Sequence, residues 1–250
     1  MVSSASERPS GRSSSRTAVV WAGLEPTLRG EPLDVLDIGG GTGGFAVRVG
    51  ALGHRVTVVD PSPDALAALD RRAREHDVAV TGRQGDLSTL LDVVDHDSAD
   101  VVLCHGVLEV VDDPAAALAT LARVLRPGGV LSLLVAQRHA AVVARAMAGH
   151  FQQALALLAP TGPGQRSSVA GGRPGRRYTH DELTGLVGGA GFGVDAVHAV
   201  RVFTDLVPGS LLDLEPGASS ALVELEQAVA TRPEYLPLAT QLHLLAHRSS

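Results

Sequence analysis

A cluster of glycines lies between an apolar run and a helical pattern in the stretch 35–45. Glycine at positions 39, 41 and 43 allows a positive φ and lets the backbone approach a ligand closely, because no Cβ intrudes. Amides of the first helical turn then point at that ligand and favour acceptor groups or negative charge. The stretch therefore predicts a strand, a tight turn and a helix, with a ligand site over the turn. The residues of this turn and its approach are Asp37, Gly39, Gly40, Gly41 and Gly43.

Polar side chains also stand where the following strands are expected to end. Asp60 closes the strand 54–60, where its carboxylate can accept both hydroxyls of a ribose. Asp86 closes the strand 78–86 after Gln84 and Gly85, and it can accept from the amino group of an adenine. His105 lies near the end of the strand 100–106, where open α/β sheets bind ligands, although a structural hydrogen bond explains it equally well.

The same residues also fit a dinucleotide cofactor. Gly39, Gly41 and Gly44 spell G-x-G-x-x-G, and Asp60 follows about 20 residues later, as a dinucleotide fold requires. On the residues of the turn alone, an NAD-binding enzyme therefore remains an alternative.

The surrounding elements alternate between strands and helices up to residue 136, which predicts a doubly wound parallel sheet. Residues 1–15 are Ser-rich and almost without apolar side chains, so we expect a disordered tail before a single domain at 16–250. Residues 137–177 break the alternation with a helical stretch and then a loop rich in Pro, Gly and Ser. We expect this insertion to form a lid beside the ligand site; a solvated linker is the alternative.

Composition limits the remaining possibilities. The chain has 250 residues, 45% hydrophobic, with one cysteine and a formal net charge of −6. It can bury one core; the single cysteine fits a reducing compartment, and no run is long enough to span a membrane. We expect a cytoplasmic protein without broad nonspecific nucleic-acid binding. The histidines show no metal-ligand spacing, and no nucleophile with an adjacent base is evident, so we predict no metal and no catalytic side chain.

Taken together, the motifs resemble those of the class I S-adenosylmethionine-dependent methyltransferases. The resemblance rests on DIGGGTG at 37–43, the acids Asp60 and Asp86, and LRPGG at 125–129 before a strand, and it spans about residues 16 to 248. It implies an α/β fold: a Rossmann-like doubly wound sheet, mostly parallel, with an antiparallel C-terminal strand and an insertion after the fifth strand. A dehydrogenase would need more parallel strands and a separate substrate lobe, so the resemblance disfavours NAD.

Further runs, RTAVVW at 16–21, CHGVLEVV at 104–111 and RVFTD at 201–205, resemble the bacterial tRNA 5-carboxymethoxyuridine methyltransferases. By this resemblance Arg16 holds the methionine carboxylate, Asp60 binds the ribose, and His105 completes the site. The full set expected to bind S-adenosyl-L-methionine is Arg16, Asp37, Gly39, Gly40, Gly41, Gly43, Asp60, Pro61, Gln84, Gly85, Asp86 and His105.

Two methyl acceptors remain open. One is a carboxylate on a wobble uridine in the anticodon arm of a tRNA, which is ionised at neutral pH and needs alignment rather than a general base. The other is a carboxyl or hydroxyl group of a small molecule, which the acidic net charge and the absence of the family's lysine-rich patch favour. A cofactor-binding regulator without turnover is a third interpretation. The expected substrate-binding residues are Arg166, Arg173, Arg176, Arg177 and Arg201, because a guanidinium suits carboxylate and phosphate alike.

Overall fold

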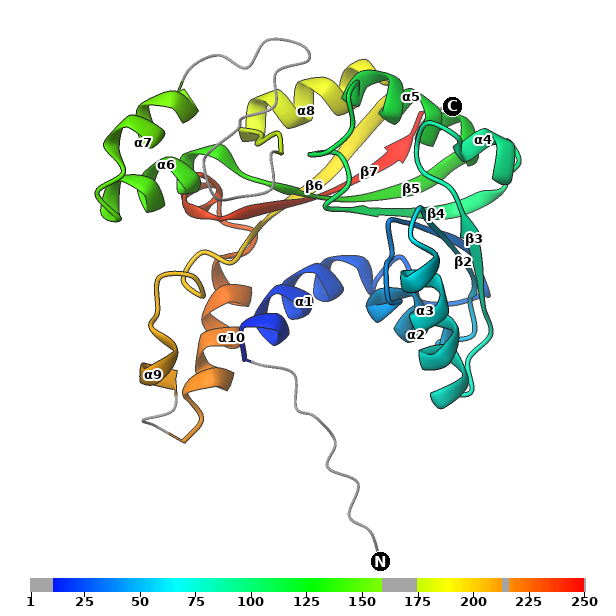
Figure 1. Cartoon of the computed structure of the whole chain (residues 1–250), viewed down its shortest axis with the longest axis horizontal. Coiled ribbons are helices and arrows are strands. Elements are labelled where there is room, and N and C mark those ends of the chain that lie inside the picture. The colour runs from blue at the N-terminus through cyan, green and yellow to red at the C-terminus, as the bar shows by residue number, and fades with distance from the viewer. Residues whose placement is uncertain (1–10, 159–174, 213–215, 250) are drawn as a thin grey trace, which may run out of the picture.

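One seven-stranded sheet organises the computed structural model, which describes residues 11–158, 175–212 and 216–249 (Figure 1). Its strands lie in the order β3-β2-β1-β4-β5-β7-β6. Their bounds are β1 Asp34–Ile38, β2 Arg55–Asp60, β3 Val80–Gln84, β4 Ala99–His105, β5 Leu125–Ala136, β6 Phe192–Val200 and β7 Gln241–Arg248. β7 pairs antiparallel with both β5 and β6, whereas the pairs among β1 to β5 are parallel. The predicted mixed sheet with an antiparallel last strand is confirmed.

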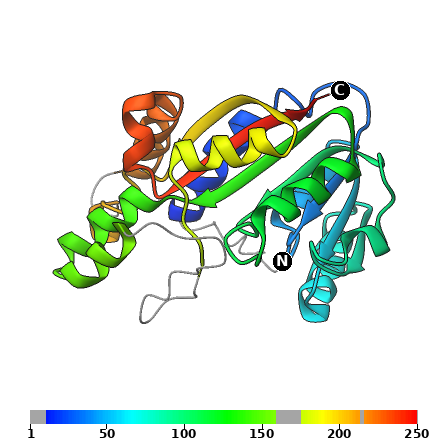
Figure 2. The same ribbon diagram turned by 90° about the horizontal axis from the view of Figure 1, so that it is seen from above.

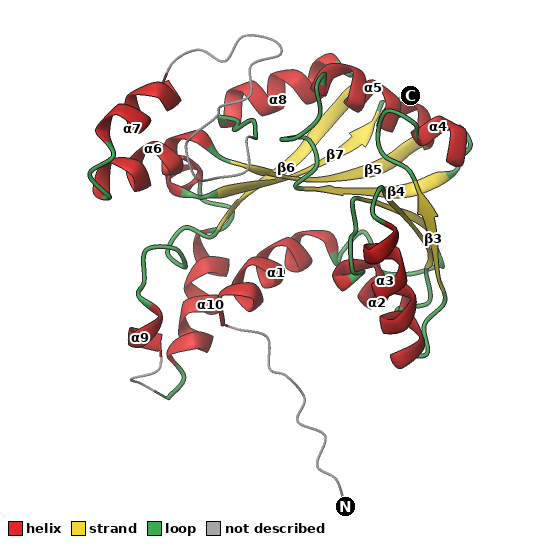
Figure 3. Cartoon of the chain, viewed as in Figure 1, coloured by secondary structure: helices red, strands yellow, loops and turns green. Residues whose placement is uncertain are grey.

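Helices cover both faces of this sheet, so the domain has three layers (Figure 3). One face carries α1 Gly11–Leu24, α2 Gly44–Gly50, α3 Pro63–Glu75 and α10 Ala218–Val229. The other carries α4 Leu90–Val93, α5 Pro114–Val124 and α8 His180–Gly189. Viewed from above, α5 and α8 lie over the same face of the sheet (Figure 2). Further short helices are α6 Arg138–Met147, α7 Phe151–Leu158, α9 Gly209–Leu212 and the 3₁₀ helix η1 Pro233–Leu238.

The central strands are apolar on both faces because helices cover both. On β4, Val102 and Cys104 pack toward α5, while Val101 and Leu103 pack toward α2 and α3. Burial on two sides is why β4 reads as a nearly continuous apolar run and not as an alternating one. Burial raises the pKa of the Cys104 thiol, so this cysteine acts as a small core residue.

Side-chain caps set the start of several helices. Ser62 accepts from the amide of Ala65 at the start of α3, and Asp113 accepts from two amides at the start of α5. Thr179 and Glu182 form a capping box at the start of α8. These caps satisfy amides that would otherwise have no partner within the helix.

Several boundaries of helices and strands have a local physical cause. The chain is helical from Gly11, inside the segment 1–15 expected to be disordered, because extending a helix already begun costs little once its first turn exists. The helical stretch 138–158 splits into α6 and α7 at Gly149, which has φ of 75°. β6 ends at Val200 because Arg201 takes φ of 60°. None of the helices in the described part of the chain is long and apolar enough to cross a membrane.

Candidate functional site

The glycine turn between β1 and α2 lies at the carboxyl end of the central strands. Gly39 and Gly41 have φ of 66° and 55°, a region that non-glycine residues rarely occupy. The turn is held by the carboxylate of Asp60 at the end of β2: Oδ2 accepts from the amide of Gly41 at 3.0 Å, and Oδ1 accepts from the amide of Ser62 at 2.9 Å. Asp60 therefore joins two turns, and each of its oxygens keeps a second lone pair for a ligand.

Asp37 lies beneath the same turn. Its side chain is buried, and a Cβ placed on Gly40 would come within 2.4 Å of its Oδ2, so the turn packs directly on the carboxyl group. Burial, together with the negative charge of Asp60, raises the pKa of Asp37 to about 7. Position 40 requires glycine because any side chain would displace this carboxyl group.

A cavity of about 820 Å³ opens beside the turn. Of the predicted cofactor residues, Gly39, Asp60, Pro61 and Asp86 line it. Gln84 and Gly85 lie behind this wall: the Gln84 side chain donates to the carbonyl of Pro61, and the Gly85 amide donates to the carbonyl of Asp60. The rest of the wall is largely apolar and comes from the loop after β3, the loop after β4 and the first turns of α5. Its side chains include Leu87, Val107, Val110, Val111 and Ala117.

Asp86 is fixed by the turn that it begins. The amides of Ser88 and Thr89 and both their hydroxyls donate to its Oδ1, and these hydrogen bonds lower the pKa of Asp86 against the opposing effect of burial. An ionised Asp86 held in this way is an acceptor for an amino group in the cavity.

His105 lies at the end of β4 on the opposite side of the sheet from this cavity wall. Its ring meets Phe45 of α2 edge to face at 5.1 Å, and Phe45 in turn lies 6.2 Å from Trp21 of α1. The guanidinium of Arg48 stacks over Trp21 at 3.6 Å. The aromatic group thus links the N-terminal helix to the glycine turn. Of Arg16, the structure describes the backbone within α1, so its predicted contact lies outside the described side chains.

The end of the insertion, at Arg176 and Tyr178, returns to the carboxyl ends of β4 and β5. The amide of Arg176 donates to the carbonyl of Glu109 at 2.7 Å, and the amide of Tyr178 donates to the carbonyl of Ala136 at 2.9 Å. The guanidinium of Arg176 is buried and donates to the carbonyls of Val111 and Asp112. Arg176, predicted to bind substrate, ties this segment to the loop after β4 through these carbonyls.

Arg177 is placed differently. It is half-buried, and burial followed by the nearby positive charge of Arg145 lowers its pKa, against the opposing effect of the negative charge of Glu109. Arg145, on α6, was not singled out from the sequence. Within the described residues the structure shows no ion pair or hydrogen bond from either guanidinium. Two cations that repel each other favour an anion between or beside them.

The other predicted substrate residues do not join this pair. Arg201 forms an ion pair with Asp205 on the turn after β6. Arg166 and Arg173 lie outside the described residues. Arg126 of the LRPGG run bonds Asp34 at 3.0 Å and Asp100 at 2.6 Å, so this motif ties the amino ends of β1 and β4 to the start of β5.

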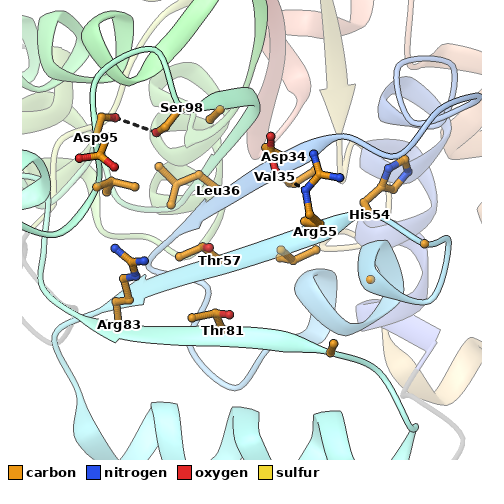
Figure 4. A pocket seen from close by; sticks show the side chains of 16 residues that line it. Asp34, Val35, Leu36, His54, Arg55, Thr57, Thr81, Arg83, Asp95 and Ser98 are labelled. Atoms are coloured by element: carbon orange, nitrogen blue, oxygen red, sulfur yellow. Dashed lines mark hydrogen bonds and ion pairs between the residues drawn. The ribbon is translucent and has the colours of Figure 1, made fainter.

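A second cavity, of about 570 Å³, begins at those amino ends and extends along β1, β2 and β3 (Figure 4). Thr57, Thr81 and Arg83 line it, with Asp34 paired to Arg55 at one side. It lies at the opposite end of the strands from the glycine turn and is separate from the candidate site. The described residues contain no group of three His, Cys, Asp or Glu side chains that could hold a metal ion.

The strand order, the glycine turn and the acids at the ends of β2 and β3 define a class I methyltransferase, an enzyme that uses S-adenosylmethionine. Comparisons agree: residues 36–133 match the family described as a methyltransferase domain. The chain resembles the S-adenosylmethionine-dependent methyltransferase from Mesorhizobium loti, with TM-score 0.58 and 21% identity over 92% of this chain and 98% of that one. It also resembles magnesium protoporphyrin IX methyltransferase from Synechocystis with bound S-adenosylhomocysteine, with TM-score 0.60 and 17% identity over 95% and 83% of the two chains.

A sequence relative narrows the family. The tRNA 5-carboxymethoxyuridine methyltransferase of Escherichia coli is 30% identical over 238 residues, which cover 93% of this chain and 88% of that protein. The chain belongs to the family of this enzyme, within the S-adenosylmethionine-dependent methyltransferases.

The described residues fit the cofactor. A Cβ on Gly39 would lie 2.5 Å from Cγ2 of Val107, so this glycine keeps open a cavity wall that a side chain would fill. The cavity offers acidic acceptors at Asp60 and Asp86 and apolar walls at Leu87 and Val107, a donor set that matches a ribose and a flat purine. When bound, S-adenosylmethionine supplies an activated methyl group.

Proposed function

We propose that this methyltransferase esterifies a carboxylate, and that the carboxylate is that of 5-carboxymethoxyuridine at the wobble position of a tRNA. The observation that carries the proposal is the pair Arg145 and Arg177, two neighbouring cations whose guanidinium groups form no ion pair with a described residue, at the carboxyl edge of the sheet. The likeness to the Escherichia coli enzyme along nearly the whole chain supports the choice of acceptor.

In this proposal the cofactor's adenosine lies in the cavity between Asp60 and Asp86, and its methionine end lies over the glycine turn toward His105 and α1. Arg177 binds the acceptor carboxylate or a neighbouring phosphate. An ionised carboxylate is already nucleophilic, so the protein only aligns it with the methyl group and excludes water. That is consistent with the inert, buried state of Cys104.

The experiment incubates the protein with labelled S-adenosylmethionine and tRNA that carries 5-carboxymethoxyuridine, followed by nucleoside analysis. We expect label in a methyl ester, which mild alkali releases as methanol, whereas methyl groups on ribose or base resist it. Label that survives alkali, or that enters only small molecules, would contradict the proposal.

A pair of variants tests the role of Arg177. Arg177→Gln should raise KM for the tRNA at unchanged affinity for the cofactor, because it removes a charged contact worth about 1.5–3 kcal/mol. Arg74→Gln is the matched control, since Arg74 is exposed on α3 and paired with Asp70. Equal KM values for the two variants would remove Arg177 from the acceptor site.

A further inference from the structure

Three histidines and a serine form a row across the sheet under α1. His105 on β4 is in register with Leu134 on β5, Leu134 with His243 on β7, and His243 with His198 on β6. Side chains in register point to the same face of a sheet, and Ser132, two residues before Leu134, shares that face. The row therefore leads from the candidate site into the core.

The contacts within the row are short and continuous. Ser132 Oγ lies 2.9 Å from Nε2 of His105 and 2.9 Å from Nε2 of His243. The rings of His243 and His198 stack at 5.2 Å, and Gly23 of α1 lies directly over both, so close that a Cβ there would come within 2.9 Å of His198. Ser132 and His243 are both fully buried.

The positions of the protons follow from this burial. Desolvation, and then the neighbouring imidazoles His105 and His198, hold the pKa of His243 well below its ordinary value, so His243 is neutral and carries one ring proton. Its Nδ1 is buried without a hydrogen-bond partner. A buried N–H without an acceptor is more costly than a buried lone pair without a donor, so the proton of His243 lies on Nε2 and is donated to Ser132.

Ser132 has a single hydroxyl proton. Its oxygen has two lone pairs, one of which accepts from His243; when the hydroxyl proton is donated along the other short contact, to Nε2 of His105, the hydrogen bonds run in one direction from His243 through Ser132 to His105. In this arrangement Nε2 of His105 accepts a hydrogen bond and carries no proton, which leaves the proton of a neutral imidazole on Nδ1.

We infer that Ser132 and His243 are positioning residues, which hold the ring of His105 in place and in the tautomer that carries its proton on Nδ1. His105 then carries its N–H on Nδ1, with its ring fixed at the carboxyl end of β4. The inference rests on the proposed function for its consequence, since His105 lies in the proposed methionine end of the cofactor site. The proton positions assigned within the row are independent of the proposed function.

Ring nitrogen NMR of histidine-labelled protein without cofactor, at neutral pH, tests the row directly. We expect a protonated Nδ1 for His105 and a protonated Nε2 for His243, assigned by their loss in His105→Asn and His243→Gln. In Ser132→Ala, where no hydroxyl bridges the rings, the His105 signals should change. A protonated Nε2 on His105 in the unaltered protein would overturn the inference.

Cofactor binding by calorimetry gives the second readout. His243→Leu removes the donor to Ser132 and should weaken binding about fivefold, the value of one net hydrogen bond. His243→Gln places an amide N–H near the former Nε2 and should restore most of the affinity, which a purely packing role would not do. His247→Gln, at an exposed histidine on the same strand, is the control.

Different results would contradict the proposed cofactor site and the positioning role of Ser132 and His243. If Asp60→Ala leaves cofactor binding unchanged, the proposed cofactor site is wrong, and the ring spectra still decide the proton positions in the row. If Asp60→Ala weakens binding while His243→Leu changes neither the His105 spectrum nor the affinity, the positioning role is wrong and the cofactor site stands.

Discussion

Because of Asp37, the stability of the domain should fall as the pH rises from about 4 to about 7. In the folded state its pKa is about 7, because the carboxyl group is buried and lies near Asp60; in the unfolded chain it returns to the ordinary 3.8. Between these two values the folded state keeps a proton that the unfolded state has lost. The free energy of unfolding therefore decreases by about 1.4 kcal/mol per pH unit in this range and is constant outside it.

The whole contribution is about 4 kcal/mol, and the part between about pH 5.5 and pH 7 is about 2 kcal/mol. Asp37→Asn has nearly the same shape and does not titrate. The assay is urea unfolding of both proteins at about pH 5.5 and about pH 8. The contributions of the other titrating groups are the same in both proteins, so they cancel when the two proteins are compared. The free energy of unfolding of the variant, minus that of the unaltered protein, should be about 2 kcal/mol larger at the higher pH than at the lower pH.

Asp64→Asn, at an exposed carboxylate in the first turn of α3, controls for a simple change of net charge. If the profiles of Asp37→Asn and the unaltered protein run parallel over this range, Asp37 is ionised in the folded state. The reasoning from burial would then be refuted.

Two further changes test the site and its surroundings. Asp60→Ala removes the acceptor of the Gly41 and Ser62 amides and the proposed acceptor of the ribose hydroxyls. Calorimetry should show cofactor affinity reduced by at least tenfold, because charge-assisted hydrogen bonds contribute about 1.5–3 kcal/mol each. Asp64→Ala should bind normally, and equal affinity of the two variants would place the ribose elsewhere. Glu226→Gln should lower the free energy of unfolding by about 1–3 kcal/mol, because the fully buried carboxylate accepts from the amides of Val202, Phe203 and Thr204, and an amide nitrogen cannot accept. Glu224→Gln, exposed on the same helix, should be neutral in chemical denaturation, and an equal loss in both variants would argue against a role for the buried carboxylate.

The features that the sequence predicts well are local ones. The glycine turn, the caps at Ser62 and Asp113 and the capping box at Thr179 each depend on residues within a few positions of one another. The parallel pairing of β1 to β5 follows from the alternation of strands and helices, and the antiparallel last strand followed from the resemblance to known methyltransferases.

What the sequence does not reveal depends on distant partners. Arg176 reads as a free cation until the structure shows the carbonyls of Val111 and Asp112 around it. Ser132 is an unremarkable polar residue in an apolar strand, and its meaning comes from His243, 111 positions later. The apolar cavity wall, including Leu87 and Val107, is likewise indistinguishable from core in the sequence.

The place of β7 between β5 and β6 constrains the order in which the chain can fold. β6 has no neighbour in the sheet except β7, so it cannot join until the chain has been made as far as Arg248. α1 packs on β6, β7 and α10, so the first helix must also wait for the last strand. During synthesis β1 to β5 can pair while β5 still exposes an open edge, which is a site for mispairing. Closure of that edge, a non-local step, should limit the folding rate and should bring the C-terminal strands and the N-terminal helix into place together.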